Sequence, residues 1–413
     1  MYAGIAGLKT HMQNLNVIGN NVANVNTPGY KSARAVFKTS IYTTLSGGSN
    51  GTQSIGGVNP SQIGYGSAMG TIDIDMSSGN YSVTGKPTDM MIDGEGFFLV
   101  GNKDLPTNFT GGATDVGTSG ALTSLSLTRV GDFDFMADGY LAKDMDGNVV
   151  YGFLCTGVAT QDDVDAGRAA KVGDAMFSDQ LVPIRKPRVY RDETGAMHVG
   201  YPRAGGGYDS ADADIPDGGV TSSDNGVFSA APGGNLHLMD YGASAESPST
   251  ASLASIRNIT VDQNTGVITG VCGDLGNQVI TIGCIAIGQV SNPNGVTQIG
   301  NSYYKAQQGA GELTISTMGN AGASLGINYV NGSLAVEGGN DMTNMAADAE
   351  NAIDGTRLRG TDGQILTSGL EMSKTDLAQE IANMIVTQRG YQANTRIITV
   401  TDQMLEELVN MKR

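Results

Sequence analysis

The chain has 413 residues, 60 of them glycine, and a formal net charge of −17 at pH 7. Glycine readily adopts positive φ, so its abundance favours many short strands joined by tight turns over a compact catalytic α/β domain. The negative charge argues against binding to nucleic acid, which needs clustered lysine and arginine, and against adsorption on anionic membranes.

The first 25 residues predict a helix. Apolar residues recur at steps of three or four, which is the pattern of a helix that packs against another helix. They are Ile5, Leu8, Met12, Leu15, Ile18, Val22 and Val25. Thr27-Pro28-Gly29 should end this helix, because proline disfavours helical backbone at the preceding residue. The start of the chain lacks a basic region followed by a continuous apolar segment, so we expect no cleaved Sec-type signal peptide.

Residues 31–70 are rich in serine, glycine, threonine and glutamine, and we expect an extended connector there. Beyond them the hydrophobic period changes to two, and turn dipeptides typical of hairpins become frequent. They are Asp93-Gly94, Asp138-Gly139, Asp146-Gly147, Asp217-Gly218, Asn225-Gly226, Asn294-Gly295, Asn331-Gly332 and Asp362-Gly363. Strands are expected at Gly96–Val100, Val149–Leu154, Val279–Ile282 and Ser302–Tyr304. The middle of the chain is therefore predicted to be rich in β-structure.

The C-terminal segment predicts a second, longer helix, from about Lys374 to Met411. Apolar residues follow one another at intervals of seven, with further apolar residues between them. They are Leu370, Leu377, Ile381, Met384, Tyr391, Ile398, Leu405 and Leu408. Ser373 is the expected N-cap. We refer to these eight residues and the seven of the first helix as the predicted seam.

The two helices must meet to bury the predicted seam, so the expected fold is nested: α+β, multidomain, with β domains inserted between terminal helices that pair as a coiled coil. The expected domains are 1–30 with 368–413 (helical assembly domain), 31–70 (connector), 71–153 with 291–367 (inner β domain) and 154–290 (outer β domain). One helix pair recovers less free energy by burial than its ordering costs. Both ends are therefore predicted to be disordered in the monomer and helical after assembly.

The sequence offers no catalytic or cofactor motif, and an enzyme is not expected. None of the three histidines stands in a zinc-protease or triad context. Asp144-Met145-Asp146-Gly147 lacks the closing glutamate of a calcium loop, so a hairpin turn is favoured. We expect Cys155, Cys272 and Cys284 to be buried small hydrophobic residues, with one disulfide and a free thiol as the alternative. The acidic stretch from about 160 to 250 is interpreted as a solvated surface, with a divalent-cation site as the less favoured reading.

Two terminal segments resemble the flagellar rod and hook family of axial proteins. NLNVIGNNVANVNTPGYKS (Asn14 to Ser32) resembles the N-terminal signature of that family, and the stretch from Ser368 to Lys412, with MIVTQRGYQAN inside it, resembles the C-terminal one. Weaker matches lie at Ile92–Val100, Leu127–Leu141, Asn292–Val296 and Gly300–Tyr304. Together they cover about a third of the chain.

The resemblance implies a structural subunit without cofactors, exported by the flagellar type III apparatus and located outside the cell in the hook and basal body. It further implies a helical homopolymer, with terminal helices inside and β domains outside. The large domain over 154–290 is characteristic of hook subunits, whose curved, flexible tube transmits motor torque to the filament. The implied partners are other copies of this chain, the distal rod protein, the hook-cap protein and the hook–filament junction protein.

Two alternatives stay open. A distal rod subunit would form a straight, rigid polymer. A surface adhesin rich in β-structure would use its helices only to form a small oligomer. Membrane insertion is not expected, because no run of 18 apolar residues occurs.

Overall fold

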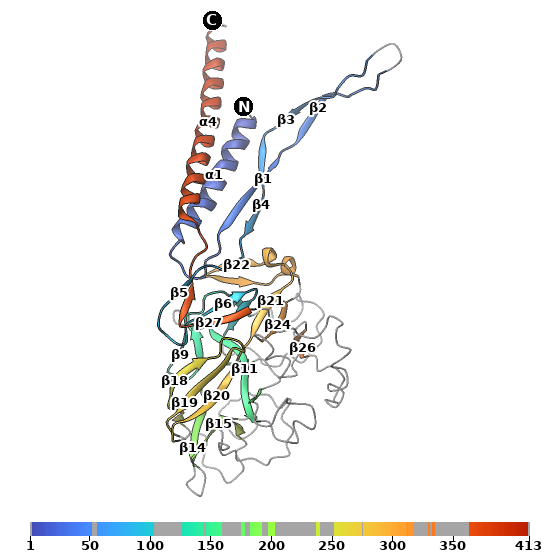
Figure 1. Ribbon diagram of the computed structural model, residues 1–413. Coiled ribbons are helices and arrows are strands. Elements are labelled where there is room, and N and C mark those ends of the chain that lie inside the picture. The colour runs from blue at the N-terminus through green and yellow to red at the C-terminus, as the bar shows by residue number, and fades with distance from the viewer. Residues whose placement is uncertain are drawn as a thin grey trace. The chain divides into compact units, whose positions relative to one another are not determined.

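A computed structural model describes the protein. It covers residues 2–51, 56–102, 125–143, 146–158, 175–177, 182–191, 197–202, 237–239, 252–274, 276–311, 313–317, 329–330, 333–334 and 363–411. The chain divides into two compact units (Figure 1): unit 1 is made of residues 1–76 and 373–413, and unit 2 of residues 77–372. The prediction of a mainly β protein with a helix near each terminus is confirmed.

Unit 1 contains two helices and a long two-stranded ribbon. The helices are α1 (Tyr2–Ala23) and α4 (Leu377–Met411). The ribbon consists of β1 (Ala33–Thr39), β2 (Tyr42–Ser46), β3 (Ser61–Gly64) and β4 (Ser67–Ile74). β1 pairs with β4 and β2 pairs with β3, both antiparallel. The expected connector over 31–70 is therefore a paired ribbon in the same unit as the helices.

The end of α1 and the start of α4 test the helix-stop and helix-cap signals predicted from the sequence. α1 ends at Ala23, and the turn that follows it contains Gly29 with a positive φ of 65°, as the Thr-Pro-Gly signal predicted. At the start of α4, the predicted cap at Ser373 is wrong. Oδ1 of Asp376 accepts hydrogen bonds from the backbone N–H of Ala378 and Gln379, so Asp376 caps the helix. Ser373 instead bonds to Thr375 in the preceding turn.

Unit 2 is built of strands and two 3₁₀ turns, η3 (Pro293–Gly295) and η4 (Gln308–Ala310). Its described strands are β5 (Tyr81–Val83), β6 (Met90–Gly94), β7 (Phe97–Gly101), β8 (Ser126–Thr128), β9 (Phe133–Phe135), β10 (Leu141–Lys143), β11 (Val149–Val158), β12 (Ala175–Phe177), β13 (Val182–Pro183), β14 (Arg188–Arg191), β15 (Met197–Pro202), β16 (His237–Met239), β17 (Ser252–Leu253), β18 (Ile256–Val261), β19 (Val267–Cys272), β20 (Gln278–Ile285), β21 (Ile287–Val290), β22 (Thr297–Gly300), β23 (Tyr303–Lys305), β24 (Leu313–Ser316), β25 (Tyr329–Val330), β26 (Ser333–Leu334), β27 (Gly363–Thr367) and β28 (Gly369–Glu371).

Sixteen of these strands join in one large sheet, whose main path runs β18-β19-β20-β11-β7-β21-β24-β25-β26. A separate four-stranded sheet has the order β16-β15-β14-β17, and two strand pairs, β27 with β6 and β28 with β5, stand beside them. The four strands expected from the sequence are β7, β11, β20 and β23. Three of them lie in the main path because they are continuous apolar runs, which suit strands covered on both faces.

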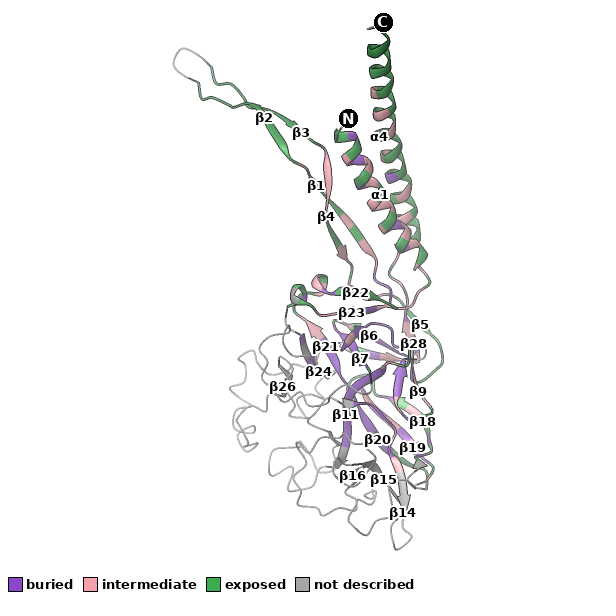
Figure 2. Cartoon of the chain, turned by 180° about the vertical axis from the view of Figure 1, so that it is seen from behind, coloured by how far each residue is buried: buried purple, intermediate pink, exposed green. Residues whose placement is uncertain are grey.

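The core of unit 2 lies around β7, β11 and β20, which Figure 2 shows as buried. Phe98 of β7 and Phe133 of β9 meet edge to face with ring centroids 5.1 Å apart. Met90, Leu141 and Ile282 are buried in the same cluster. Apolar side chains from distant parts of the chain thus share one core.

The sheet pairing differs from the domain boundaries expected from the sequence. β20, inside the expected outer domain of 154–290, pairs with β11 through Gly152↔Ile285, Phe153↔Cys284 and Leu154↔Gly283. β18 and β19 continue the same sheet. Strand pairing between segments far apart in sequence leaves no local signal, so the boundary could not be located from turn content.

Two predicted hairpin turns are present. Asp138-Gly139 connects the paired strands β9 and β10, and Asp146-Gly147 connects β10 and β11, with positive φ at both glycines. Asp93-Gly94 differs, because β6 pairs with β27 and not with β7. Asn294-Gly295 lies in the 3₁₀ turn η3. Three predicted turns lie outside the described residues, at 217–218, 225–226 and 331–332. Of the predicted turn Asp362-Gly363, residue 362 also lies outside them.

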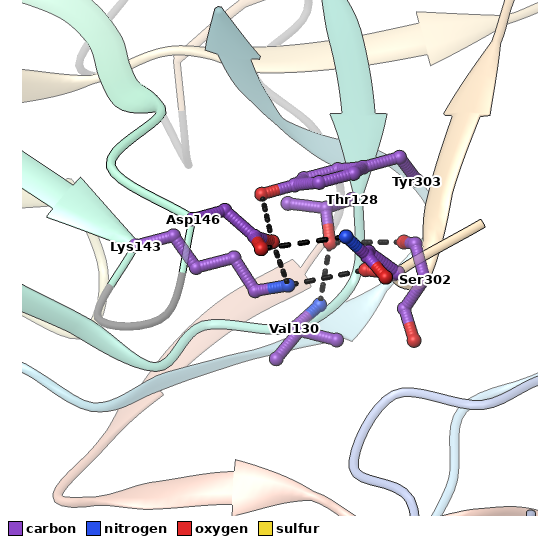
Figure 3. A network of polar contacts seen from close by, with 7 residues as sticks. Thr128, Val130, Lys143, Asp146, Ser302 and Tyr303 are labelled. Atoms are coloured by element: carbon purple, nitrogen blue, oxygen red, sulfur yellow. Dashed lines mark hydrogen bonds and ion pairs between the residues drawn. The ribbon is translucent and has the colours of Figure 1, made fainter. Parts of the chain in front are cut away.

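A polar network fixes the Asp146 turn (Figure 3). The Asp146 carboxylate accepts hydrogen bonds from Nζ of Lys143 at 3.4 Å, the hydroxyl of Tyr303 at 2.9 Å and Nδ2 of Asn301 at 3.3 Å. Lys143 also donates to the Asn301 carbonyl and lies over the Tyr303 ring. Burial, opposed by a hydrogen bond with Asn148 and assisted by Asp146, raises the pKa of Tyr303. The network joins the β10–β11 turn to the start of β23.

Cys155, Cys272 and Cys284 are all buried, as predicted, and none forms a disulfide with another. Burial raises the pKa of Cys284 to about 12, with a smaller contribution from Asp262. The Cys284 thiol contacts the Thr265 carbonyl at 3.2 Å. Within the described part of the chain, neither helix is long and apolar enough to cross a membrane.

Candidate assembly surface

The two helices of unit 1 lie side by side and run in opposite directions (Figure 1). The start of α1 faces the second half of α4: the position of a Cβ at Gly4 would be 3.7 Å from side-chain carbons of Ile397 and Ile398. The end of α1 faces the beginning of α4, where Nδ2 of Asn21 donates to Oε1 of Glu380 at 3.1 Å. Because α4 has 35 residues and α1 has 22, α4 extends beyond its partner.

Glycines bring the helices close together. A Cβ at Gly7 would lie 2.6 Å from Nδ2 of Asn394, and a Cβ at Gly390 would lie 2.7 Å from Cε1 of His11. Such distances leave no room for a side chain. Each glycine therefore provides the space that a side chain of the opposite helix occupies.

The remaining contacts between the helices are largely polar. Nδ2 of Asn14 donates to Oγ1 of Thr387 at 3.0 Å, and the Thr387 hydroxyl donates to the carbonyl of Asn383. Thr387 is the one α4 residue among those described that is buried. A contact made of hydrogen bonds fixes the register of the pair more strictly than it stabilises it, because the net contribution of each bond is only about 1 kcal/mol.

Asn21 ties both helices to the ribbon. Its amide, in a residue that is 1% exposed, donates to the Ala33 carbonyl and to Glu380, and accepts from the Ala33 N–H and the Tyr30 hydroxyl. All four hydrogen-bonding positions of the amide are thereby used. Burial, followed by the nearby Glu380 carboxylate, raises the pKa of Tyr30.

About half of the predicted seam is exposed in the single chain. Ile18 is buried. Exposed members are Ile5, Met12, Leu377, Ile381, Tyr391, Leu405 and Leu408. Half-buried members are Leu8, Leu15, Val22, Val25, Met384, Ile398 and Leu370. Leu370 lies in strand β28, outside α4, so its place in the heptad was wrong. The helices meet on their glycine and asparagine side because only there can their backbones approach closely.

Unit 1 therefore exposes many large apolar side chains, and Figure 2 shows much of its helices and ribbon as exposed. Besides the exposed members of the predicted seam, α4 exposes Ile385, Val386, Ile397, Val400, Met404, Val409 and Met411. The ribbon and the residues beside it expose Val36, Phe37, Ile41, Tyr42, Leu45, Val58, Ile63, Tyr65 and Ile72. Sequence reasoning missed the exposed apolar residues of the ribbon. We call the exposed apolar residues of α1, α4 and the ribbon together the apolar assembly surface. An exposed apolar patch of this extent marks a site of protein association.

The described residues contain no group of three or more histidine, cysteine, aspartate or glutamate side chains that could hold a metal ion. The Asp146 carboxylate is bonded to Lys143, Tyr303 and Asn301, which fits the expected hairpin turn.

Comparison with known proteins gives matches at both ends and over the full length. The family profile "Flagella basal body rod protein" matches residues 1–31, and "Flagellar basal body rod FlgEFG protein C-terminal" matches residues 367–411. The flagellar hook protein FlgE of Borreliella burgdorferi is 26% identical, with 100% of this chain and 99% of the relative aligned. These matches support a protein of the flagellar rod and hook family.

Other members of this family align as completely. The flagellar basal-body rod protein FlgG of Bacillus subtilis is 26% identical over 100% of this chain and 98% of its own. The flagellar hook protein FlgE of Salmonella typhimurium is 25% identical over 99% of this chain and 98% of its own. The family is one of structural components of the flagellum, and the two profiles match the two segments that form the helices of unit 1 and the residues beside them.

Proposed function

We propose that the protein is the structural subunit of the bacterial flagellar hook, and that it polymerises through unit 1 into a curved, flexible tube. The observation that carries this proposal is the apolar assembly surface on a chain that aligns with hook proteins from end to end. Each large apolar side chain gains about 1.5–3 kcal/mol when it is fully buried. A polymer, in which every copy contacts several others, buries such a surface on all sides.

The predicted seam enters this proposal as the contact between copies. In the single chain the helices meet through glycine and polar groups, which leaves Ile5, Met12, Ile381, Leu405 and Leu408 exposed. These residues belong to the predicted seam, whose spacing is that of helices that pack on other helices. We infer that they form coiled-coil contacts with neighbouring copies.

A polymer of this kind needs neither a cofactor nor a catalytic group, and we propose that the protein is not an enzyme. Its partners would be further copies of the chain, the distal rod, hook-cap and hook–filament junction proteins, and the flagellar type III export apparatus. Export by that apparatus, without a cleaved signal peptide, would take it to the hook outside the cell. The four-stranded sheet of β14–β17 would belong to the outer domain.

A distal rod subunit is the second candidate, because the rod protein of Bacillus subtilis aligns as well as the hook proteins do. Electron microscopy of negatively stained polymer separates the two candidates. A hook subunit gives open-ended, curved tubes, and a rod subunit gives straight ones. Discrete small oligomers would contradict both and would favour an adhesin.

A further inference from the structure

The chain enters and leaves unit 2 through two neighbouring strands. Unit 2 begins at Ser77 and ends at Met372, and β5 and β28 are its first and last strands. They pair antiparallel, with Tyr81 opposite Glu371 and Val83 opposite Gly369. The points where the chain enters and leaves therefore lie at the same end of one strand pair. A force that pulls them apart opens such a pair one hydrogen bond at a time.

A buried cluster lies at that end. Oε1 of Glu371 accepts a hydrogen bond from the backbone N–H of Gly79 at 2.6 Å. Nη1 of Arg129 lies 3.9 Å from Oε2 of Glu371, and the two side chains are 3% and 1% exposed. We call Gly79, Arg129 and Glu371 the junction cluster.

Arg129 connects the junction cluster to the body of unit 2. Its guanidinium donates to the carbonyls of Ile92 at 3.0 Å and Gly94 at 2.7 Å, both in β6, and lies over the Phe97 ring. β6 in turn pairs with β27 over five residue pairs. A single guanidinium thus joins the last strand of the unit to a neighbouring pair of strands.

The incoming and outgoing segments also touch directly. The N–H of Met372 donates to the carbonyl of Asn80 at 2.8 Å, and a Cβ at Gly79 would collide with the Met372 carbonyl oxygen. Only glycine fits at this position, because any side chain would overlap with backbone. The two segments therefore cross the boundary of the unit as a joined pair.

A buried ion pair is a poor way to stabilise a core, because removing two charges from water costs about as much as their attraction returns. Burial lowers the pKa of Arg129, and the Glu371 carboxylate opposes that effect. The pair is thus not explained by the stability of the unit alone. Its position at the end of the β5–β28 pair suggests resistance to force.

We propose that the junction cluster is a mechanical fastener, which holds the incoming and outgoing segments of unit 2 together when force separates them. The biological need for it rests on the proposed function, since the subunit of a torque-transmitting tube experiences such force. The inference is distinct from assembly, because all three residues lie inside unit 2.

The test is a single-molecule measurement on the full chain, with handles on its two ends and a constant pulling force. The decisive variant carries both Arg129→Met and Glu371→Leu, because replacing both partners leaves no unpaired buried charge. We expect unit 2 of this variant to open about a hundredfold faster under force than the unaltered protein. Its midpoint of unfolding in urea should shift little.

The matched control removes a second ion pair of unit 2, between Lys143 and Asp146, by combining Lys143→Met with Asp146→Leu. That pair lies at the β10–β11 turn, away from β5 and β28. Its loss should leave the rate of opening under force unchanged. A junction variant that opens at the rate of the unaltered protein, or a control that opens equally fast, would overturn the proposal.

If the double variant does not fold, Arg129→Lys provides the test. Lysine keeps the charge but cannot donate to both β6 carbonyls in the geometry of a guanidinium. We expect about tenfold faster opening under force; an unchanged rate contradicts the proposal. Tube formation by the unaltered protein is scored separately, so failure of the hook assignment and failure of the fastener remain distinguishable.

Discussion

The two units of this protein distribute their apolar residues in opposite ways. In unit 2 the large apolar side chains are buried among strands that are distant in sequence, as for Phe98, Phe133 and Ile282. In unit 1 the helices meet through glycine, asparagine and threonine, while Ile381, Leu405 and many similar residues remain exposed. The described part of unit 2 thus forms a core of its own as a single copy. Unit 1 has the surface of a component whose partners are other molecules.

The largest expected effect comes from placing a charge on the predicted seam. Leu377→Asp or Met384→Asp should abolish polymerisation, because a carboxylate buried without a partner costs several kcal/mol at every contact of the polymer. Unit 2 should keep its strand content, since both positions lie in α4. Electron microscopy and circular dichroism measure the two effects. Gln388→Asp, at an exposed polar position of the same helix, is the control; normal tubes from the Leu377 variant would refute the assignment.

Filling the space between the helices should have the next largest effect. Gly7→Leu would drive a side chain into Asn394, and we expect it to destabilise the α1–α4 contact by about 1–3 kcal/mol. The same substitution at Gly19, where an added Cβ would meet no atom within 4 Å, should stabilise α1 by roughly 1 kcal/mol through helix propensity. Thermal unfolding followed by helical circular dichroism compares them. Equal effects would mean that the glycine contact does not position the helices.

Removing the Asn21 amide should have a smaller effect, confined to unit 1. Asn21→Ala leaves the Tyr30 hydroxyl, the Ala33 backbone and Glu380 without this partner, and should cost about 1–3 kcal/mol. Asn24→Ala is the control, since the described hydrogen bonds of the Asn24 amide join it to its near neighbours Asn20 and Thr27 and not to the ribbon or to α4. Proteolysis after α1 reports the loosening; equal cleavage of both variants would contradict the role of Asn21.

The smallest expected effect is on how the stability of unit 1 depends on pH. The folded state raises the pKa of Tyr30 above its usual value of 10.0, because burial and then Glu380 disfavour the phenolate. The stability from this tyrosine is therefore fully present below pH 10 and is lost as the pH rises through the folded-state pKa. Tyr30→Phe should reduce the alkaline loss of helix in unit 1. Tyr2→Phe, at an exposed position, should not; an identical alkaline profile for Tyr30→Phe would refute this linkage.

The features that sequence reasoning predicted correctly depend on local chemistry. Pro28 and Gly29 follow α1, and Gly139 and Gly147 form hairpin turns because these residues restrict or permit φ within one or two positions. Continuous apolar runs identified β7 and β11 for a similar reason. Such signals lie within a few residues of the structure that they specify.

The features that were missed depend on contacts between distant segments. The ribbon of β1–β4 was hidden because its serine- and glycine-rich sequence resembles a linker, and pairing of β11 with β20 joins residues more than a hundred positions apart. The heptad frame suggested that Leu370 belongs to α4, although hydrogen bonds to β5 place it in a strand. The helix contact followed the glycines because close backbone approach outweighed the apolar periodicity.

Hydrogen exchange tests the central claim that unit 1 is completed by other copies. The sequence predicts that both ends are disordered before assembly, whereas the structure of the single chain has both helices formed. We expect amides of α1, α4 and β2–β3 to exchange rapidly in dilute monomer and slowly in the polymer, while β7, β11 and β20 are protected in both. Equal, strong protection of α4 in monomer and polymer would contradict the account.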